Sequence, residues 1–251
     1  MAKYAYTDRE RINVIYSKNA LTQDRNKAFF CPNPQCGAQL YVCAVDGSRS
    51  AYFSATKAKY PHVPGCPFGS KDVAFEENKF DQTQFVFDQA MDNLYSVTAE
   101  SKSSKTPSGY SKGEVKKHPP RTLKQIYSMC KSYPIDDIYG NKEISEMILD
   151  DRSAYRYPKG CFGYRIIEAV TKGKLYDDKQ KQIYLAAPKS STKYSFILSF
   201  LDNKTYILLR NEIYNNRDKI IVVAGKWEKT EKYNVFLSEI RGRKQVVVIK
   251  R

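Results

Sequence analysis

Cys31-Pro-Asn-Pro-Gln-Cys36 and His62-Val-Pro-Gly-Cys66 are the two stretches that decide how the first part of this 251-residue chain folds. Together they supply three thiols and one imidazole, which is a complete ligand set for a closed tetrahedral zinc site. Proline or glycine beside the ligands lets the backbone turn tightly enough to aim two side chains at one ion. We therefore expect one structural Zn2+ per chain, held by Cys31, Cys36, His62 and Cys66. Ordinary buried thiols or a disulfide pair are the alternative.

Short apolar and aromatic runs surround these ligands at residues 11–16, 40–45 and 51–54, and polar turns separate them. Such runs are typical of strands, which here would hold the two ligand-bearing turns. Between 79 and 97, apolar residues recur at three- and four-residue spacings, with Asp81 or Thr83 available as an N-cap. This pattern predicts one amphipathic helix that closes a small zinc-binding β domain over residues 1–98.

Residues 99–120 contain few residues that form cores and many Ser, Lys, Gly and Pro residues. This composition predicts a flexible linker, with His118 as a solvated residue within it. A second domain, 121–251, is expected to follow the linker.

The second domain begins with apolar periodicities at 122–133 and 141–149, which predict two short helices, the second behind an Asn cap. Strand patterns follow at 163–170, 182–187 and 194–201, then a helix pattern at 205–214, then strand patterns at 219–227 and 232–240. Three strands, a helix and two strands is the element order of the oligonucleotide-binding barrel, the OB-fold. Gly225 can provide the bend that lets a small barrel close. The expected fold class is therefore β-rich α+β, with an OB-like five-stranded barrel.

The chain carries 42 Lys and Arg against 27 Asp and Glu, a formal net charge of +15. Residues 1–98 hold 11 against 10, and residues 99–251 hold 31 against 17. A basic surplus in one part of a chain fits a polyanion partner, although a generally basic background is the alternative. No basic amphipathic helix points to a membrane partner. The opening Met-Ala-Lys-Tyr-Ala-Tyr has no apolar run, so we expect neither a signal peptide nor a membrane span, and a cytoplasmic protein.

In an OB-like barrel the loops at 171–181 and 226–233 would flank the single-strand-binding face. Both contain lysines and aromatic rings, which suit phosphates and bases respectively. The alternative is that Trp227 packs inside the barrel and the lysines only solubilise two hairpin tips. The candidate nucleic-acid contacts are Lys172, Lys174, Lys179, Lys226, Trp227, Lys229, Lys232 and Tyr233.

Residues 5–70 resemble the N-terminal part of the competence-protein CoiA-like family of bacterial proteins. The resemblance rests on a phenylalanine directly before the first cysteine, Phe30-Cys31-Pro32, an aromatic pair, Tyr52-Phe53, and the histidine–cysteine end at 62–66. It implies a role in bacterial or phage DNA processing, with a restriction-like nuclease domain next along the chain. Such a nuclease needs an Asp/Glu-x-Lys triplet on a strand. The triplets present, such as Asp177-Asp-Lys179, lie outside apolar strand cores.

The preferred hypothesis is a nucleic-acid-binding protein that favours single strands and is not an enzyme. With His62 committed to zinc and His118 in a linker, no Ser/His/Asp or Cys/His catalytic arrangement is expected. A divalent-metal nuclease is one alternative, and an adaptor whose two domains bind other proteins is another.

Overall fold

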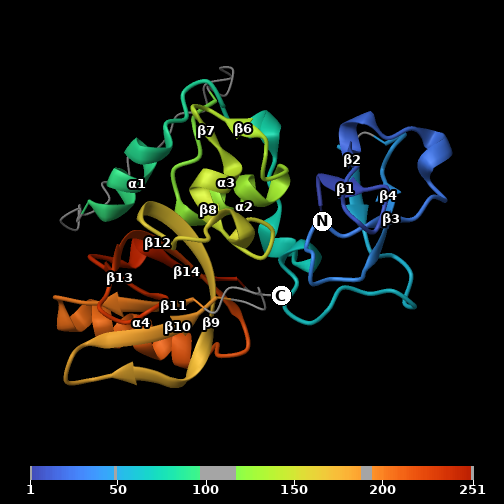
Figure 1. The fold of residues 1–251 in the computed structure, drawn as a ribbon. Helices are drawn as coiled ribbons and strands as arrows, with labels where there is room; N and C mark the ends of the chain where they lie inside the picture. The colour runs from blue at the N-terminus through green and yellow to red at the C-terminus, as the bar shows by residue number, and fades with distance from the viewer. Residues whose placement is uncertain (1, 48–49, 97–116, 188–193, 250–251) are drawn as a thin grey trace, which may run out of the picture.

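The computed structural model describes residues 2–47, 50–96, 117–187 and 194–249. Within these residues the protein is a β-rich α+β structure, as the sequence predicts. Figure 1 shows a small N-terminal sheet set apart from a larger C-terminal sheet, with short helices above the larger sheet. None of the helices in the described part of the chain combines the length and the apolar character that crossing a bilayer requires.

The small sheet has five strands in the order β2-β1-β3-β4-β5, and all its pairings are antiparallel. The three predicted strands are present in shortened form as β2, β4 and β5. Fully buried Tyr4, Leu40 and Phe53 fill the core of this sheet. The strands are β1 (Tyr4–Tyr6), β2 (Val14–Tyr16), β3 (Phe29–Phe30), β4 (Gln39–Cys43) and β5 (Tyr52–Ser54), accompanied by 3-10 turns η1 (Ser17–Asn19), η2 (Thr22–Asp24), η3 (Pro67–Gly69), η4 (Lys71–Val73) and η5 (Glu77–Lys79).

Helix α1 (Phe87–Tyr95) begins later than the sequence predicts, and it packs elsewhere. The Asp81 carboxylate does not cap it but accepts a hydrogen bond from the backbone N–H of Thr83, at 2.9 Å. The buried face of α1 joins Ile126 and Ile144 in one core cluster. The expectation that this helix closes the small sheet is therefore wrong. Its apolar face is buried against the helices and strands that follow it in the sequence.

Residues 99–116 of the expected linker, 99–120, lie outside the described residues. Near the end of the linker, His118 contacts the folded body, because its carbonyl accepts a hydrogen bond from the N–H of Asp81 at 3.1 Å. The His118 ring also contacts the Phe80 ring edge-on, with centroids 5.6 Å apart. The expectation of a solvated His118 is wrong, since its ring covers an aromatic side chain of the folded body.

Helix α2 (Leu123–Ser132) confirms the first helix predicted after the linker. It begins with a capping box in which Thr122 Oγ1 accepts from the N–H of Gln125 at 3.3 Å. The second predicted helix is only one turn, α3 (Ile144–Met147). Its expected cap, Asn141, instead accepts a hydrogen bond from the N–H of Phe87 in α1, at 3.4 Å. Short strands β6 (Ile138–Tyr139), β7 (Lys142–Glu143) and β8 (Ile148–Leu149) and turn η6 (Ala154–Arg156) complete this region.

Five strands of the larger sheet close on themselves in the order β9-β10-β11-β13-β12-β9. Every pairing in this ring is antiparallel except that of β11 with β13, and α4 falls between β11 and β12. Strands β8 and β14 attach outside the ring, to β9 and β12. The elements are β9 (Gly163–Asp177), β10 (Gln182–Ala186), β11 (Ser195–Ser199), α4 (Asn203–Tyr214), β12 (Ile220–Lys229), β13 (Val235–Glu239), η7 (Arg243–Gln245) and β14 (Val246–Ile249).

Strand β9 is much longer than predicted, because its first half pairs with β12 and its second half with β10. Most of the loop expected at 171–181 is therefore strand. Ile183 pairs with Tyr176, whereas Leu185 pairs with Thr171, so residues 172–175 bulge opposite Tyr184. Lys172, Gly173 and Lys174 interrupt the apolar alternation, and this bulge explains why the sequence pattern conceals the strand.

Gly225 on β12 is required by packing. A Cβ placed there would lie 2.6 Å from the ring of Trp227 and 2.8 Å from Ser238 Oγ. The Trp227 ring therefore occupies the space that a side chain at position 225 would fill. This close approach, inside the ring of strands, is a sharper reason for glycine than the bend expected from the sequence.

Candidate metal centre and barrel surface

The four predicted metal ligands come together at one point of the small sheet. Cys31 follows β3, Cys36 precedes β4, and His62 and Cys66 belong to the segment after β5. Their ligand atoms all lie within 4.8 Å of one another. The expectation that these side chains converge is confirmed, and the set can hold a metal ion.

Two distances within the set agree with those expected for tetrahedral coordination. Cys31 Sγ lies 3.7 Å from Cys66 Sγ, and Cys36 Sγ lies 3.5 Å from His62 Nδ1. Two sulfurs in a tetrahedral zinc site with Zn–S bonds of about 2.3 Å are about 3.8 Å apart, and a sulfur and a nitrogen about 3.5 Å. All six cysteines are free thiols, so the disulfide alternative is not what the structure contains.

Local hydrogen bonds shape the two ligand-bearing turns. The N–H of Cys36 donates to the carbonyl of Asn33 at 3.0 Å, and Asn33 Oδ1 accepts from the N–H of Gln35 at 2.9 Å. On the other side, the N–H of Cys66 donates to the carbonyl of Val63 at 3.0 Å. Gly65 has a φ of +82°, which glycine adopts without strain. Backbone hydrogen bonds therefore help to hold both turns in the shape that brings the ligands together.

Arg11 holds the first turn from outside, a role that the sequence did not reveal. Its Nε donates to the carbonyl of Cys31 at 2.9 Å, and its Nη2 donates to the carbonyls of Asn33 at 3.0 Å and Cys36 at 2.9 Å. One guanidinium thus fixes both ends of the turn. Because backbone carbonyls carry no sequence signature, a lone arginine twenty residues upstream of Cys31 offered no signal.

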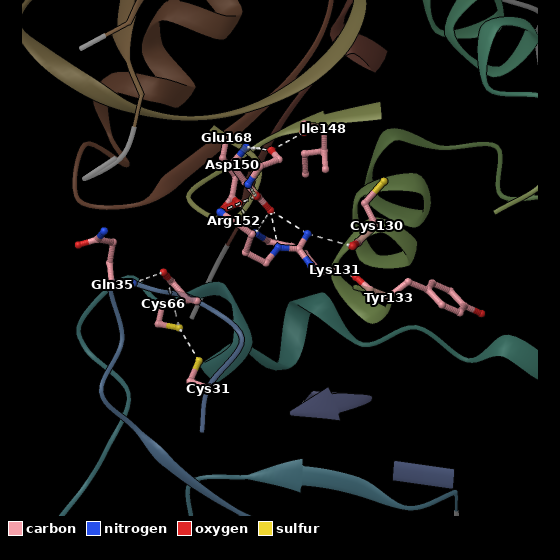
Figure 2. Close-up of polar contacts among 12 residues, drawn as sticks. Cys31, Gln35, Cys66, Cys130, Lys131, Tyr133, Ile148, Asp150, Arg152 and Glu168 are labelled. Atoms are coloured by element: carbon pink, nitrogen blue, oxygen red, sulfur yellow. Dashed lines mark hydrogen bonds and ion pairs between the residues drawn. The ribbon is translucent and has the colours of Figure 1, made fainter. Parts of the chain in front are cut away.

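Burial of the ligands favours a bound cation. Cys31 and Cys36 are at most 1% exposed and Cys66 is 7% exposed. Burial raises the pKa of the Cys31 thiol well above its ordinary value, because an isolated thiolate is poorly solvated there. A divalent ion reverses this preference by stabilising the thiolates directly. Figure 2 shows the Cys31 and Cys66 sulfurs pointing toward each other.

A buried ionic network connects the small sheet to the larger one (Figure 2). Lys131 of α2 contacts both Asp150, at 2.6 Å, and Glu168 of β9. Arg152 Nε donates to Asp150 Oδ2 at 2.8 Å, and Arg152 Nη1 donates to Tyr4 Oη in β1 at 2.6 Å. A chain of contacts therefore runs from β1 through Arg152, Asp150 and Lys131 to β9.

The network is sealed from solvent, since its four charged residues are between 1% and 6% exposed. Burial raises the pKa of Glu168 to about 7, while the neighbouring cations hold the pKa of Asp150 below its usual range despite burial. Two carboxylates and a lysine could suggest catalysis, but a substrate cannot reach them without the chain opening. The one sequence signal was a carboxylate inside the apolar run Ile166-Ile-Glu-Ala-Val170.

The acidic–x–lysine triplets within the described residues occupy surface positions. Glu77 and Lys79 form the 3-10 turn η5, and Asp177 and Lys179 flank the β9–β10 hairpin tip. Asp202 caps helix α4, where its carboxylate accepts from the N–H of Thr205 at 2.6 Å. The triplets at 100–102 and 114–116 lie outside the described residues.

The Trp227 side chain is 1% exposed and packs inside the closed ring of strands. Its ring contacts Phe196 with centroids 5.1 Å apart, and its Nε1 donates to the carbonyl of Arg165 at 3.1 Å. The expectation that Trp227 stacks on a base is therefore wrong. As in the alternative raised by the sequence, the indole is part of a hydrophobic core.

The other predicted residues of the β12–β13 hairpin are exposed. Tyr233 is 88% exposed at its tip, and Lys229 and Lys232 lie beside it. Lys226 lies elsewhere, because it pairs with Tyr164 of β9 and its N–H contacts Tyr95 of α1. Tyr233 therefore takes the place expected for Trp227 as the ring presented by this hairpin.

Lys172 brings the two predicted loops together, although residues 182–225 separate them in the sequence. Its Nζ contacts Ser195 Oγ at the start of β11. The N–H of Ser195 in turn donates to the carbonyl of Asn234 at 2.9 Å, directly after Tyr233. Lys174 lies nearby, with its Nζ 5.5 Å from the Tyr184 ring and 3.3 Å from Asp177. Lys179 is exposed at the tip of the β9–β10 hairpin.

A row of partly exposed side chains lies between these groups on the outside of the ring. Tyr184 of β10 pairs with Ile197 of β11, which pairs with Leu237 of β13. Their neighbours along each strand are mostly buried, so these three face outward. We call this row, together with Lys172, Lys174 and Tyr233, the barrel face. Tyr184, Ile197 and Leu237 are not among the contacts predicted from the sequence, although the alternation of apolar and polar residues in 182–186 is visible.

Comparisons of the chain with known protein families, with curated proteins and with solved structures found no match.

Proposed function

We propose that this protein binds single-stranded nucleic acid across the barrel face, and that a zinc ion held by Cys31, Cys36, His62 and Cys66 stabilises its N-terminal part. The nucleic acid would lie over Tyr184, Ile197 and Leu237, with the β9–β10 and β12–β13 hairpins on either side. The metal would be structural and would not take part in chemistry at the barrel face.

The donor set supports zinc. Thiolate and imidazole ligands favour zinc over the oxygen-preferring Mg2+ and Ca2+, and four ligands close the tetrahedron. A closed site has no open position for a water molecule, so it suits a structural ion. The bound ion with three thiolates carries a net negative charge, which the adjacent Arg11 guanidinium offsets.

The strand order supports an OB-like barrel. Numbered from β9, the ring runs one, two, three, five, four and back to one, and the third and fifth strands are parallel. A helix joins the third and fourth strands. This order is that of the OB-fold, in which the second and third strands and two flanking loops bind oligonucleotides.

The observation that carries the proposal is the contact chain from Lys172 through Ser195 to Asn234. It places cations of one hairpin strand and the exposed ring of the other hairpin at a single surface. Lysines there would neutralise phosphates, and the Tyr184 and Tyr233 rings would stack on bases, each stacked base contributing about 1–3 kcal/mol.

Fluorescence anisotropy with the full chain tests this proposal. Labelled single-stranded DNA, single-stranded RNA and duplex DNA are titrated between about 50 and 300 mM salt. We expect at least one of the two single strands, DNA or RNA, to bind more tightly than the duplex. The double variant Lys172→Ala/Lys174→Ala should lower the salt slope of single-strand binding by about 0.7 to 1.4, at about 0.7 per phosphate contact. The lower value applies if Lys174 keeps its Asp177 partner, 3.3 Å away, instead of contacting a phosphate.

Tyr184→Ala should weaken binding about tenfold with an unchanged salt slope, because a ring contributes stacking and no charge. Tyr214→Ala is the matched control, since it removes an exposed ring from helix α4, outside the barrel face. No binding of any single strand at low salt would refute the proposal and favour a protein-binding adaptor. Magnesium-dependent cleavage of the strands would instead favour the nuclease.

A further inference from the structure

The N-terminal part of the chain is more basic than its overall count suggests. Residues 1–70 contain nine Lys and Arg and four Asp and Glu, whereas residues 71–98 contain two and six. The near-neutral total for 1–98 therefore averages two oppositely charged segments. The structure separates them, because helix α1 packs with the helices of the larger body and the small sheet keeps its own core.

Three of the four carboxylates in residues 1–70 have partners within the small sheet. Asp8 accepts hydrogen bonds from the N–H groups of Ile12 and Asn13, each at 2.8 Å. Asp24 pairs with Lys27 at 2.8 Å, and Asp46 pairs with Arg25. Asp24 and Asp46 therefore neutralise Lys27 and Arg25, whereas Asp8 is held by backbone groups and forms no ion pair among the described residues.

Four of the remaining cations of residues 1–70 lie over aromatic rings. Lys18 lies 5.6 Å from the centroid of the Tyr16 ring on β2, and the other three lie near β3 and β4. Arg9 lies 5.8 Å from the centroid of the Phe30 ring, Lys57 lies 4.2 Å from that of Tyr41, and Lys59 lies 5.3 Å from that of Tyr60. Arg9, Lys57 and Lys59 are exposed, and none of the three forms an ion pair within the described ranges of the chain. Each keeps its charge available to an anion.

The three rings gather on one side of β3 and β4. Phe30 pairs with Gln39, and Tyr41 follows two residues later on the same side of β4. The N–H of Gln39 donates to the carbonyl of Tyr60 at 3.3 Å, which brings Tyr60 to the same place. We call this set of three rings and three cations the module face. It lies on the small sheet, apart from the barrel face on the larger sheet (Figure 1).

We infer that the module face is a second contact surface for the same single strand, an inference that rests on the proposed function. An exposed ammonium or guanidinium group can keep one side packed on an aromatic ring while its other side approaches a phosphate. The Tyr60 ring, 36% exposed, is available to stack on a base. The N-terminal part thus binds the strand, in addition to its stabilisation by the metal.

Strand length distinguishes the two surfaces. Anisotropy is measured with the full, zinc-loaded chain and single strands of about 8 nucleotides, within the site size of one OB-fold, and of about 30 nucleotides. Lys57→Ala/Lys59→Ala should lower the salt slope by about 1.4 for the long strand and leave the short strand nearly unaffected. Lys172→Ala/Lys174→Ala should weaken binding of both.

Arg25→Ala/Lys27→Ala is the matched control, because it removes the same charge from the same part of the chain but from cations that already have carboxylate partners. It should change the salt slope for the long strand by no more than about a third of the change expected for Lys57→Ala/Lys59→Ala. If the wild type binds and Lys57→Ala/Lys59→Ala matches it at both lengths, the inference is wrong and the proposed function stands. If Lys57→Ala/Lys59→Ala and Arg25→Ala/Lys27→Ala lower the salt slope for the long strand equally, the net charge of the N-terminal part is responsible and the inference is wrong. A wild type that binds no single strand overturns both.

Discussion

Replacing Arg11 tests how the metal site is built, because this one side chain donates hydrogen bonds to three carbonyls of the first ligand-bearing turn. Arg11→Ala leaves those carbonyls to water and removes the cation beside the negatively charged metal–thiolate cluster. A net contribution of about 1 kcal/mol per hydrogen bond predicts a loss of about 2–3 kcal/mol in metal binding. That loss corresponds to about a 30- to 150-fold weaker zinc affinity. It agrees with the usual cost of removing groups that orient metal ligands.

The assay is competition for zinc against a coloured chelator, followed by absorbance. Replacement of the metal by Co2+ reports the ligands independently, since thiolate-to-cobalt bands depend on the number of bound thiolates. Arg11→Lys separates charge from geometry, because an ammonium keeps the charge but cannot span three carbonyls. It should show an intermediate loss. Arg25→Ala, an exposed arginine of the same sheet, is the control and should bind zinc as tightly as the wild type. A wild-type zinc affinity for Arg11→Ala would refute this reasoning.

Three further results are expected. Cys36→Ser should lose stoichiometric zinc in elemental analysis, whereas Cys43→Ser, outside the ligand set, should retain it. Trp227→Ala should destabilise the chain by about 3–5 kcal/mol in urea unfolding, because it empties a packed position; an unfolding midpoint unchanged from wild type would contradict that placement. Burial raises the folded-state pKa of Glu168 to about 7 from 4.5, so the folded chain keeps a proton that the unfolded chain releases. Stability should then fall by about 3–4 kcal/mol as pH rises from about 4.5 to about 7, and Glu168→Gln should flatten the fall. An identical pH dependence of unfolding in the variant would show that Glu168 is not the group responsible.

The metal ligands could be predicted from the sequence because their chemistry is local. Cys31 and Cys36, and likewise His62 and Cys66, are close in sequence, and thiols and imidazoles are scarce enough for their spacing to carry information. The succession of strands and of helix α4 along the second part of the chain was readable for a similar reason, since apolar alternation and turn residues mark most of the strands. Arg11 escaped prediction because its partners are backbone carbonyls, which any residue supplies.

Two other errors came from interactions between distant segments. Trp227 lies at the end of the predicted strand and precedes a lysine-rich turn, a setting equally compatible with core and surface. Gly225 is what creates room for the indole inside. The boundary at residue 98 followed composition, but the apolar face of α1 pairs with α2 and the core strands. Counting charge over all of residues 1–98 averaged the basic small sheet with the acidic segment 71–98, and so concealed the basic character of the sheet. Packing, and not composition, decided where each charge lies.

Photo-crosslinking of a bound single strand, with the attached peptides identified by mass spectrometry, tests the central claim most directly. The nucleic acid is expected to cross-link to Tyr184 and Tyr233, which are partly and largely exposed on the barrel face. The long strand should add cross-links at Tyr60. Cross-links that fall on helix α4, including Tyr214, and spare the barrel face would contradict the account.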